Sequence, residues 1–439
     1  MPPPDQDLGA APPNHEVEKD AELPLTETAA PEPVESIPSQ RQLWQTSEPP
    51  SAEAPATDAA PTTTTTHLPK VGLLSKKVTH FYTVSGLIFF AIMGTLARLG
   101  LQALTFYTGA PVVTGVLWAN VAGSLVMGFL VEDRSLFREE WGEAPTAPKD
   151  PHNAAEHVKR HKAVKKTIPL YIGLTTGFCG CCTSFSSFIR DVFLALANAL
   201  PDPSLPSGAT IASRNGGYSF MALVAVILLT VSLSLSALIF GAHLALALER
   251  VTPTVPFALA RRVLDPVTVV LGWGCWLGGV FLAIWPPDRF NGPDDWRGRA
   301  VFALVFAPLG CLLRFYVSLY LNARIPAFPL GTFTVNMFGT MIEGMSYDLQ
   351  HVNGLGAVVP AALTGCQVLQ GVMDGFCGST TTISSWVAEL NGLSRRRHSY
   401  VYGVTSVAVA LGLLVVIMGS LLWTRGFDHP VCVDERHIK

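Results

Sequence analysis

The sequence predicts an all-α integral membrane protein made of two inverted four-helix repeats, which a single transmembrane helix joins, with the third helix broken in each repeat. Three observations predict this fold. The 439 residues include 49% hydrophobic and only 14% charged residues, and the mean hydropathy is +0.36. A set of Gly, Arg and Asn residues recurs at constant spacing, and two apolar spans are interrupted by Gly, Ser and Thr. Such composition is typical of a chain with several membrane spans.

The composition also excludes several classes of function. A net charge of −3 leaves too little basic surface to neutralise phosphates, so no nucleic-acid partner is expected. Only Cys432 of the eight cysteines lies in a clear tail, so no disulfide framework is expected. The CxxC of Cys179 and Cys182 favours packing of small residues over redox or zinc chemistry. No Ser–His–Asp set, metal-ligand cluster, P-loop or Rossmann glycine pattern occurs, which argues against an enzyme.

Five segments are expected along the chain. They are a disordered cytoplasmic tail over 1–75, a first repeat over 76–250, a linker transmembrane helix over 251–290, a second, inverted repeat over 291–425 and a C-terminal tail over 426–439. The N-terminal tail is rich in Pro, Ala, Glu, Ser and Thr, and it cannot bury enough apolar surface to offset the entropy of ordering.

Nine spans follow that tail. We place them at 80–107, 111–131, 167–197, 218–248, 266–285, 299–321, 328–347, 355–390 and 399–423. Lysines precede the first span, and the loop between the second and third spans is strongly basic. The excess of Lys and Arg on one side predicts a cytoplasmic N-terminus and an external C-terminus.

The repeat is visible in six residues, of three types, that recur at one offset. Each residue of the first half recurs 216 positions later, pairing Gly94, Arg98, Gly115, Asn120, Gly123 and Gly128 with Gly310, Arg314, Gly331, Asn336, Gly339 and Gly344. Four spans return a chain to its starting side, and a fifth delivers it to the other side. The span around Trp273 and Trp276 has no counterpart, so it inverts the second repeat. Inverted repeats place a shared site near the membrane midplane.

The two interrupted spans are the strongest candidates for that site. They read GFCGCCTSFSSF over Gly177–Phe188 and GFCGSTTTISSW over Gly375–Trp386. Polar, non-helical backbone at membrane depth is tolerated only where it is buried in protein or lines a cavity. Each break offers hydroxyls, among them Thr382 and Ser384.

Two asparagines and two arginines recur with the repeat. Asn120 and Asn336 lie well inside apolar spans, each followed by Gly three and eight residues later. A hydrogen bond between helices and a functional role are about equally favoured for them. Arg98 and Arg314 lie near the ends of their spans. Snorkelling to the interface is favoured over direct binding of a ligand. If the arginines do line an anion path, a vestibule is favoured over a selectivity site, because fixed cations would bind anions strongly and release them slowly.

Aromatic and hydroxyl groups supply the remaining candidates. Phe185 and Phe188 share a helical face, and their weakly positive ring edges could cradle a small anion. Tyr402 and Ser406 lie four apart on the last span, where an interfacial tyrosine is an equally good interpretation. Glu343 inside the seventh span is counter-evidence, since a membrane carboxylate is typical of proton-coupled or cation sites. The first half has Met127 at that position.

The motifs in both halves resemble the Fluc/CrcB fluoride channels, and in particular their fused two-domain eukaryotic form, FEX. The resemblance covers residues of about 80 to 423. It rests on GTLARL and GCLLRF, on GVLWANVAGSLVMG and GTFTVNMFGTMIEG, and on the two interrupted spans.

The resemblance implies a passive fluoride-selective export channel that lowers cytoplasmic fluoride from the plasma membrane. It implies a monomer in the lipid bilayer with an internal pseudo-dimer. The implied pore residues are Asn120, Asn336, Phe185, Phe188, Tyr402, Ser406, Thr382 and Ser384, with Arg98 and Arg314 at a vestibule. Backbone carbonyls of Gly180, Thr183, Gly378 and Thr381 would hold a structural sodium ion.

The two halves depart from that pattern in different places. The second break has Ile383 and Trp386 where the paired phenylalanines belong. If Gly241 and Gly419 are equivalent, the first half has Val224 and Leu228 where the second has Tyr402 and Ser406. These departures predict one functional pore built from groups of both halves. The alternatives are a proton-coupled small-solute or drug transporter that uses Glu343, and a structural membrane protein.

Overall fold

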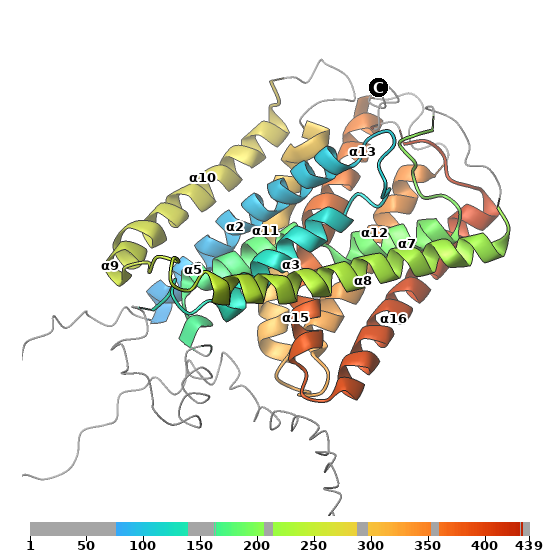
Figure 1. Cartoon of the computed structure of the whole chain (residues 1–439). Coiled ribbons are helices and arrows are strands. Elements are labelled where there is room, and N and C mark those ends of the chain that lie inside the picture. The colour runs from blue at the N-terminus through green and yellow to red at the C-terminus, as the bar shows by residue number, and fades with distance from the viewer. Residues whose placement is uncertain are drawn as a thin grey trace, which may run out of the picture.

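The computed structural model describes residues 76–138, 162, 164–205, 214–287, 297–352, 360–430 and 432, and within these ranges every regular element is a helix (Figure 1). Among the described residues, six helices are long and apolar enough to cross a membrane. The predicted all-α membrane fold is therefore confirmed. The tail expected over 1–75 and most of the tail expected over 426–439 lie outside the described residues.

The first repeat contains a long first helix, a short second helix, an interrupted third span and a long fourth helix. These elements are α2 (Lys76–Thr105), α3 (Leu117–Glu132), α5 (Pro169–Ile172), the π-helical η2 (Gly173–Cys179), α6 (Gly180–Cys182), α7 (Phe185–Leu196) and α8 (Gly216–Ala247).

The second repeat follows the same order. Its elements are η4 (Arg297–Val301), α11 (Phe302–Leu321), α12 (Leu330–His351), α13 (Pro360–Gly371), the π-helical η5 (Val372–Cys377), α14 (Gly378–Thr380), α15 (Ser384–Gly392) and α16 (Arg396–Thr424). Four spans lie between α2 and α11, and α11 is therefore the fifth span after α2, so equivalent helices of the two repeats run in opposite directions.

The linker helix is bonded to the first helix of each repeat. It comprises α9 (Phe257–Leu259), η3 (Ala260–Leu264) and α10 (Asp265–Ile284), and α10 lies against α2 and α11 (Figure 1). The indole N–H of Trp273 donates to Ser85 Oγ at 3.1 Å, and that of Trp276 donates to the Val305 carbonyl at 2.9 Å. The linker thus clamps the two repeats together as well as inverting them.

Two helix ends differ from the sequence prediction for identifiable reasons. The second span was expected from residue 111, but α3 begins at Leu117, after Gly109 with a φ of +79° and Pro111. The linker was expected from residue 266, but helix begins at Phe257. Pro266 lacks an N–H, and the wider turn of η3 carries the helix past it.

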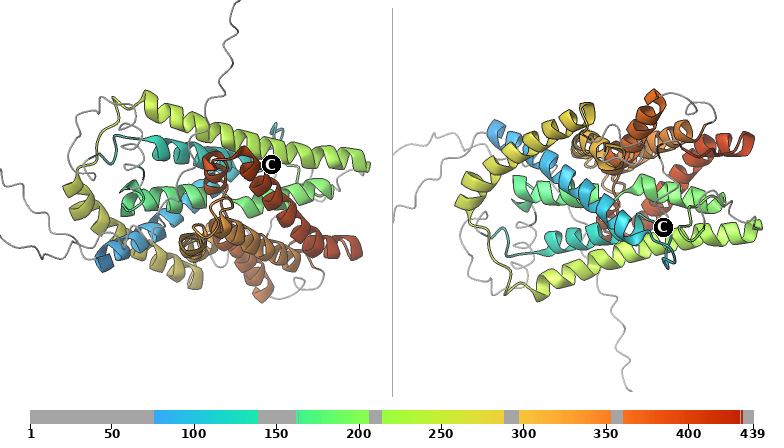
Figure 2. Two further views of the ribbon diagram at one scale, coloured as in Figure 1. Left: turned by 90° about the horizontal axis from the view of Figure 1, so that it is seen from below. Right: turned by 90° about the horizontal axis from the view of Figure 1, so that it is seen from above.

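Small residues allow helices to approach closely. Within the first repeat α3 packs along α8, which forms one edge of the bundle (Figure 2). A Cβ added at Gly128 would lie 1.9 Å from the Leu238 carbonyl oxygen. The cytoplasmic end of α3, as the predicted topology orients it, is capped by Lys165. Its Nζ donates to the carbonyls of Leu130 at 2.9 Å and Asp133 at 2.6 Å.

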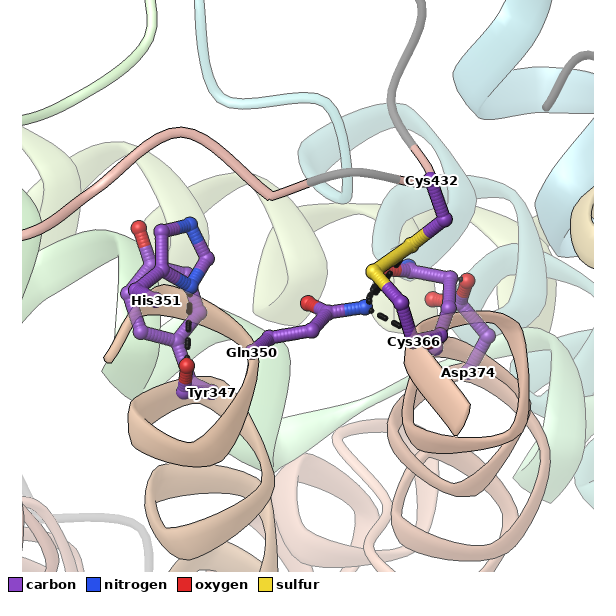
Figure 3. Close-up of a disulfide and its surroundings, with 7 residues drawn as sticks. Tyr347, Gln350, His351, Cys366, Asp374 and Cys432 are labelled. Atoms are coloured by element: carbon purple, nitrogen blue, oxygen red, sulfur yellow. Dashed lines mark hydrogen bonds between the residues drawn. A yellow bond between two sulfur atoms is a disulfide. The ribbon is translucent and has the colours of Figure 1, made fainter. Parts of the chain in front are cut away.

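A single disulfide joins Cys366 to Cys432, where the sequence analysis expected no disulfide framework. Sequence spacing could not reveal it, because 66 residues separate the two cysteines and the tail folds back onto the end of α12. There the Asp428 N–H donates to the His351 carbonyl at 2.9 Å. Beside the disulfide, Gln350 donates to the Cys366 carbonyl at 3.0 Å (Figure 3). Cys179 and Cys182 are free and buried.

Candidate functional site

Both interrupted spans break at a threonine. The chain leaves the helix at Thr183 (φ −100°, ψ 149°) and at Thr381 (φ −91°, ψ 156°), which occupy equivalent positions. Helix resumes at Phe185 in α7 and at Ser384 in α15. The breaks predicted from Gly, Ser and Thr are therefore present in both repeats.

The asparagines fix the backbone one residue beyond each break. Asn120 Oδ1 accepts the Ser184 N–H at 2.8 Å, and its Nδ2 donates to the Ser184 carbonyl at 3.4 Å. Asn336 does the same for Thr382, at 2.9 Å and 3.4 Å. Both asparagines are fully buried. Each amide thus pairs with a backbone N–H and a backbone carbonyl that the break in the helix would otherwise leave without hydrogen-bond partners.

The threonines connect the repeats reciprocally. Thr381 Oγ1 accepts the N–H groups of Phe185 at 3.2 Å and Ser186 at 3.0 Å, which open α7 of the other repeat. Thr183 Oγ1 accepts the N–H groups of Ile383 at 3.2 Å and Ser384 at 3.1 Å in return. Each repeat thus caps a helix start in its partner repeat. We call these four bonds the threonine clasp.

The predicted hydroxyls of the second break lie in this clasp. Thr382 Oγ1 lies 3.2 Å from Thr183 Oγ1, and Ser384 Oγ donates to the Cys179 carbonyl at 3.1 Å. Thr382 Oγ1 also accepts the Ser385 N–H at 3.3 Å. Both side chains are fully buried. Their roles in a pore stay predictions, while their positions at the meeting point of the repeats are now defined.

The arginines lie inside the protein and bridge the two broken spans. Arg98 Nε donates to the Cys181 carbonyl at 3.1 Å, and its Nη2 donates to the Asp374 carbonyl of the other repeat. Arg314 mirrors it, with Nε on the Ser379 carbonyl at 2.9 Å and Nη2 on the Thr176 carbonyl at 2.8 Å. Arg98 is 0% and Arg314 is 2% exposed. Both are therefore structural bridges that do not snorkel, and their vestibule role stays a prediction.

The glycines named for a sodium site make room for these guanidinium groups. A Cβ added at Gly180 would lie 2.1 Å from Arg314 Nη1, and one added at Gly378 would lie 1.9 Å from Arg98 Nη1. The helices that carry them, α6 and α14, lie against each other. Gly180, Thr183, Gly378 and Thr381 are thus brought together where the repeats meet.

Phe185 and Phe188 are both fully buried and pack edge to face, with ring centroids 5.8 Å apart. Their helix, α7, lies against α12 and α16 of the second repeat, and we call this the α7 interface. The matching α15 interface joins α15 to α3 and α8. Trp386 of α15 packs 5.4 Å from Phe185, so the rings of the two breaks are in contact.

Tyr402 and Ser406 are fully buried on α16, but both hydroxyls have partners within the protein. Tyr402 donates to Glu389 Oε2 at 2.8 Å, and Ser406 donates to the Tyr402 carbonyl at 2.7 Å. Glu389 Oε1 also accepts from Thr332 at 2.6 Å and Asn322 at 3.2 Å. Sequence reasoning missed this carboxylate, which sits three residues after Trp386 and could have been found from its place at the end of the motif.

Burial corrects the alignment of the fourth helices. Leu228, aligned with Ser406 on the assumption that Gly241 matches Gly419, is 59% exposed. Gly128 abuts Leu238 and its repeat partner Gly344 abuts Leu414, so equivalent residues of α8 and α16 are 176 positions apart. With this offset, Val226 is equivalent to Tyr402 and Thr230 is equivalent to Ser406. The second of these positions therefore carries a hydroxyl residue in both repeats, whereas the first carries a tyrosine only in the second repeat.

Glu343 is fully buried on α12 at the α7 interface. It accepts from Arg190 Nη1 at 2.7 Å and from Ser186 Oγ at 3.1 Å. Arg190 was also missed, although it follows the first break by only a few residues. The carboxylate proposed for proton coupling is thus half of an ion pair between the repeats.

The fold and the site define a class of protein, the polytopic membrane proteins whose two repeats meet through broken helices. The chain belongs to the CrcB-like protein family (CrcB, Camphor Resistance), which it matches over residues 86–242 and 301–420. The two matched regions coincide with the two repeats.

Named relatives cover one or both repeats. The chain is 56% identical over 378 residues to Fluoride export protein 1 of Neurospora crassa, covering 82% of this chain and 70% of that protein. It is 34% identical to Fluoride export protein 1 of Candida albicans over 81% and 84% of the two chains. The Fluoride-specific ion channel FluC of Pseudomonas paraeruginosa is 31% identical over 30% of this chain and 98% of its own length. No solved structure matches the chain significantly.

Proposed function

We propose that this protein is a passive fluoride-selective export channel, with no enzymatic activity, that lowers cytoplasmic fluoride. One observation carries the proposal. The α7 interface brings the buried rings of Phe185 and Phe188 together with the helix that bears Asn336 and the helix that bears Tyr402. The family and the names of its fluoride-exporting relatives support the same function.

The chemistry of that interface suits fluoride. A small, tightly hydrated anion needs several directed donors to replace its water, while width excludes larger anions. Amide, hydroxyl and ring-edge groups of Asn336, Ser184, Phe185 and Phe188 are neutral. They can replace hydration without the deep trap that a fixed cation would create.

The orientation of the protein and the membrane voltage together bear on the direction in which fluoride moves. We place the protein in the plasma membrane as a monomer, with its N-terminus cytoplasmic and its C-terminus external. The disulfide of Cys432 supports an oxidising compartment at the C-terminal end. With the cell interior negative, an anion gains about 2.3 kcal/mol per 100 mV on leaving. Export therefore needs no coupled ion.

The asymmetry of the interfaces supports a single functional pore. The α7 interface has Phe185 and Phe188, and the α15 interface has Ile383 and Trp386 at the equivalent positions. After the corrected alignment, Val226 on α8 occupies the position that Tyr402 occupies on α16. We therefore assign conduction to the α7 interface, which uses α7 from one repeat and α12 and α16 from the other.

A structural sodium ion is the second part of the proposal. Carbonyls of Gly180, Thr183, Gly378 and Thr381 would hold it, because the chain leaves the helix at both threonines and neutral oxygens suit a hard cation. The neighbouring guanidinium groups oppose a further cation, so the ion needs this full set of oxygens. Replacing sodium by N-methylglucamine should lower the thermal stability of the purified protein, and an unchanged stability would refute the site.

Fluoride efflux from proteoliposomes, followed with a fluoride electrode, tests the channel. We expect efflux driven by a potassium–valinomycin voltage with equal pH on both sides, and an unchanged rate when a proton gradient is imposed. Efflux that strictly requires a proton gradient would favour the transporter alternative. The ion pair of Glu343 with Arg190 disfavours that alternative, since a coupling carboxylate has to release and accept protons freely.

A further inference from the structure

The ion pair between Glu343 and Arg190 connects the two repeats beside the phenylalanines. Glu343 belongs to α12, and the donors to its carboxylate all come from the first turns of α7. They are Arg190 Nη1 at 2.7 Å, Ser186 Oγ at 3.1 Å and Ser187 Oγ at 3.5 Å. Ser186 and Ser187 stand between Phe185 and Phe188 in the sequence, so the carboxylate holds the turn that presents both rings.

The pair occurs in one interface only. The residue equivalent to Glu343 is Met127 on α3, and the residue equivalent to Arg190 is Ala388 on α15. Both replacements are uncharged. The charged pair therefore accompanies the phenylalanines at the α7 interface and is missing from the α15 interface, where the phenylalanines are also replaced.

Electrostatics explains why the two charges occur together. The side chain of Arg190 is 18% exposed and that of Glu343 is 0% exposed, so neither charge is well solvated. A guanidinium without a counter-charge beside an anion path would bind the anion tightly and release it slowly. A buried carboxylate without its cation would repel the anion and would itself be strongly destabilising.

We propose that Glu343 is a positioning residue of the fluoride path. It is the nearer of the two carboxylates that neutralise Arg190, the other being Asp191, and it holds the first turn of α7 through Ser186 and Ser187. The proposal rests on the proposed fluoride function. Arg190 can then connect α7 to α12 through its ion pair without binding the anion tightly itself. The rings of Phe185 and Phe188 keep their orientation.

Charge-altering variants at the two positions test the proposal in the liposome assay. Glu343→Gln keeps the shape and removes the nearer counter-charge of Arg190. Asp191, whose Oδ1 lies 3.7 Å from Arg190 Nη2, then remains as its ion-pair partner. Fluoride should then half-saturate efflux at a roughly tenfold lower concentration, and the maximal rate should fall roughly tenfold. Arg190→Met should shift half-saturation in the opposite direction. The double variant, Arg190→Met with Glu343→Met, should return both quantities to within about threefold of the wild type.

Controls separate charge from packing. Arg190→Lys keeps the charge and should leave half-saturation near the wild-type value, and Met127→Gln at the other interface should change nothing. If Arg190→Met is not monodisperse, the half-saturation concentrations of Glu343→Gln and Arg190→Lys decide the question. The proposal requires a shift in the first variant and none in the second. Single variants that shift half-saturation in the same direction, or a double variant no better than either, would overturn the inference. A wild-type protein without fluoride efflux would instead overturn the proposed function.

Discussion

The matched environments of Asn120 and Asn336 allow structural and functional costs to be separated. Each asparagine makes the same two bonds to one backbone residue, with distances that agree within 0.1 Å. Replacing either by Asp keeps the acceptor and removes the donor. The carbonyl of Ser184 or Thr382 then faces an oxygen, at a cost of about 1–3 kcal/mol that should be equal in both variants.

The effect on transport should be unequal. Asn336 belongs to α12, the helix that packs against α7 where we place the conducting pore, although its amide is bonded to Thr382. A carboxylate about 4 Å from the anion costs about 4 kcal/mol at an effective dielectric constant of about 20, or about three orders of magnitude in rate. We expect Asn336→Asp to abolish measurable fluoride efflux and Asn120→Asp to retain most of it.

Efflux from proteoliposomes measures the loss of fluoride transport in each variant. Thermal unfolding in detergent measures the loss of folding stability. The two variants should unfold at similar temperatures and differ in efflux by at least about a hundredfold. Equal loss of efflux in both variants would refute the single-pore assignment, and a larger loss in Asn120→Asp would move the pore to the α15 interface.

Three further variants probe the scaffold. Burial lowers the pKa of Lys165 from 10.5 to about 8, so the unfolded chain binds more protons between these pH values and stability should rise across them. Lys165→Met should remove that rise in thermal unfolding, and a persisting rise would exclude Lys165 as its source. Gly378→Ala should displace Arg98 and lower the free energy of unfolding by about 1–3 kcal/mol. Gly412→Ala, which has open space around its Cβ position, should leave the free energy of unfolding unchanged. Equal melting temperatures for the two variants would contradict this reasoning. Cys432→Ser should cost about 2–4 kcal/mol by opening a loop of 66 residues, and reduction of the wild type should have the same effect unless the bond is absent in solution.

The architecture could be predicted from sequence because its signals are local or periodic. Apolar length locates the spans, and the constant offset of 216 positions reveals the duplication. The breaks were visible because glycine and hydroxyl residues are rare in such numbers in a membrane helix. The asparagines stood out for the same reason, and the structure places both against the breaks.

The partners of the site residues could not be predicted, because they depend on contacts between distant helices. Nothing in the sequence shows that Thr381 reaches Phe185 or that Tyr402 is bonded to Glu389. Helix termini are also poorly determined, as the late start of α3 shows. The alignment of α8 with α16 was wrong because glycines are frequent in both, and only burial identified the facing residues.

The threonine clasp has a consequence for the synthesis of the chain. The N–H groups of Phe185 and Ser186, which begin α7, donate to the hydroxyl of Thr381, 196 and 195 positions later. At 5–20 residues per second the ribosome needs about 10–40 s to supply it. During that interval the N–H groups of Phe185 and Ser186 lack the Thr381 oxygen that accepts from them in the complete protein. The nascent first half therefore has to be sheltered by the insertion machinery or by lipid-buried neighbours until Thr381 arrives. Two halves expressed as separate chains should consequently mature only together.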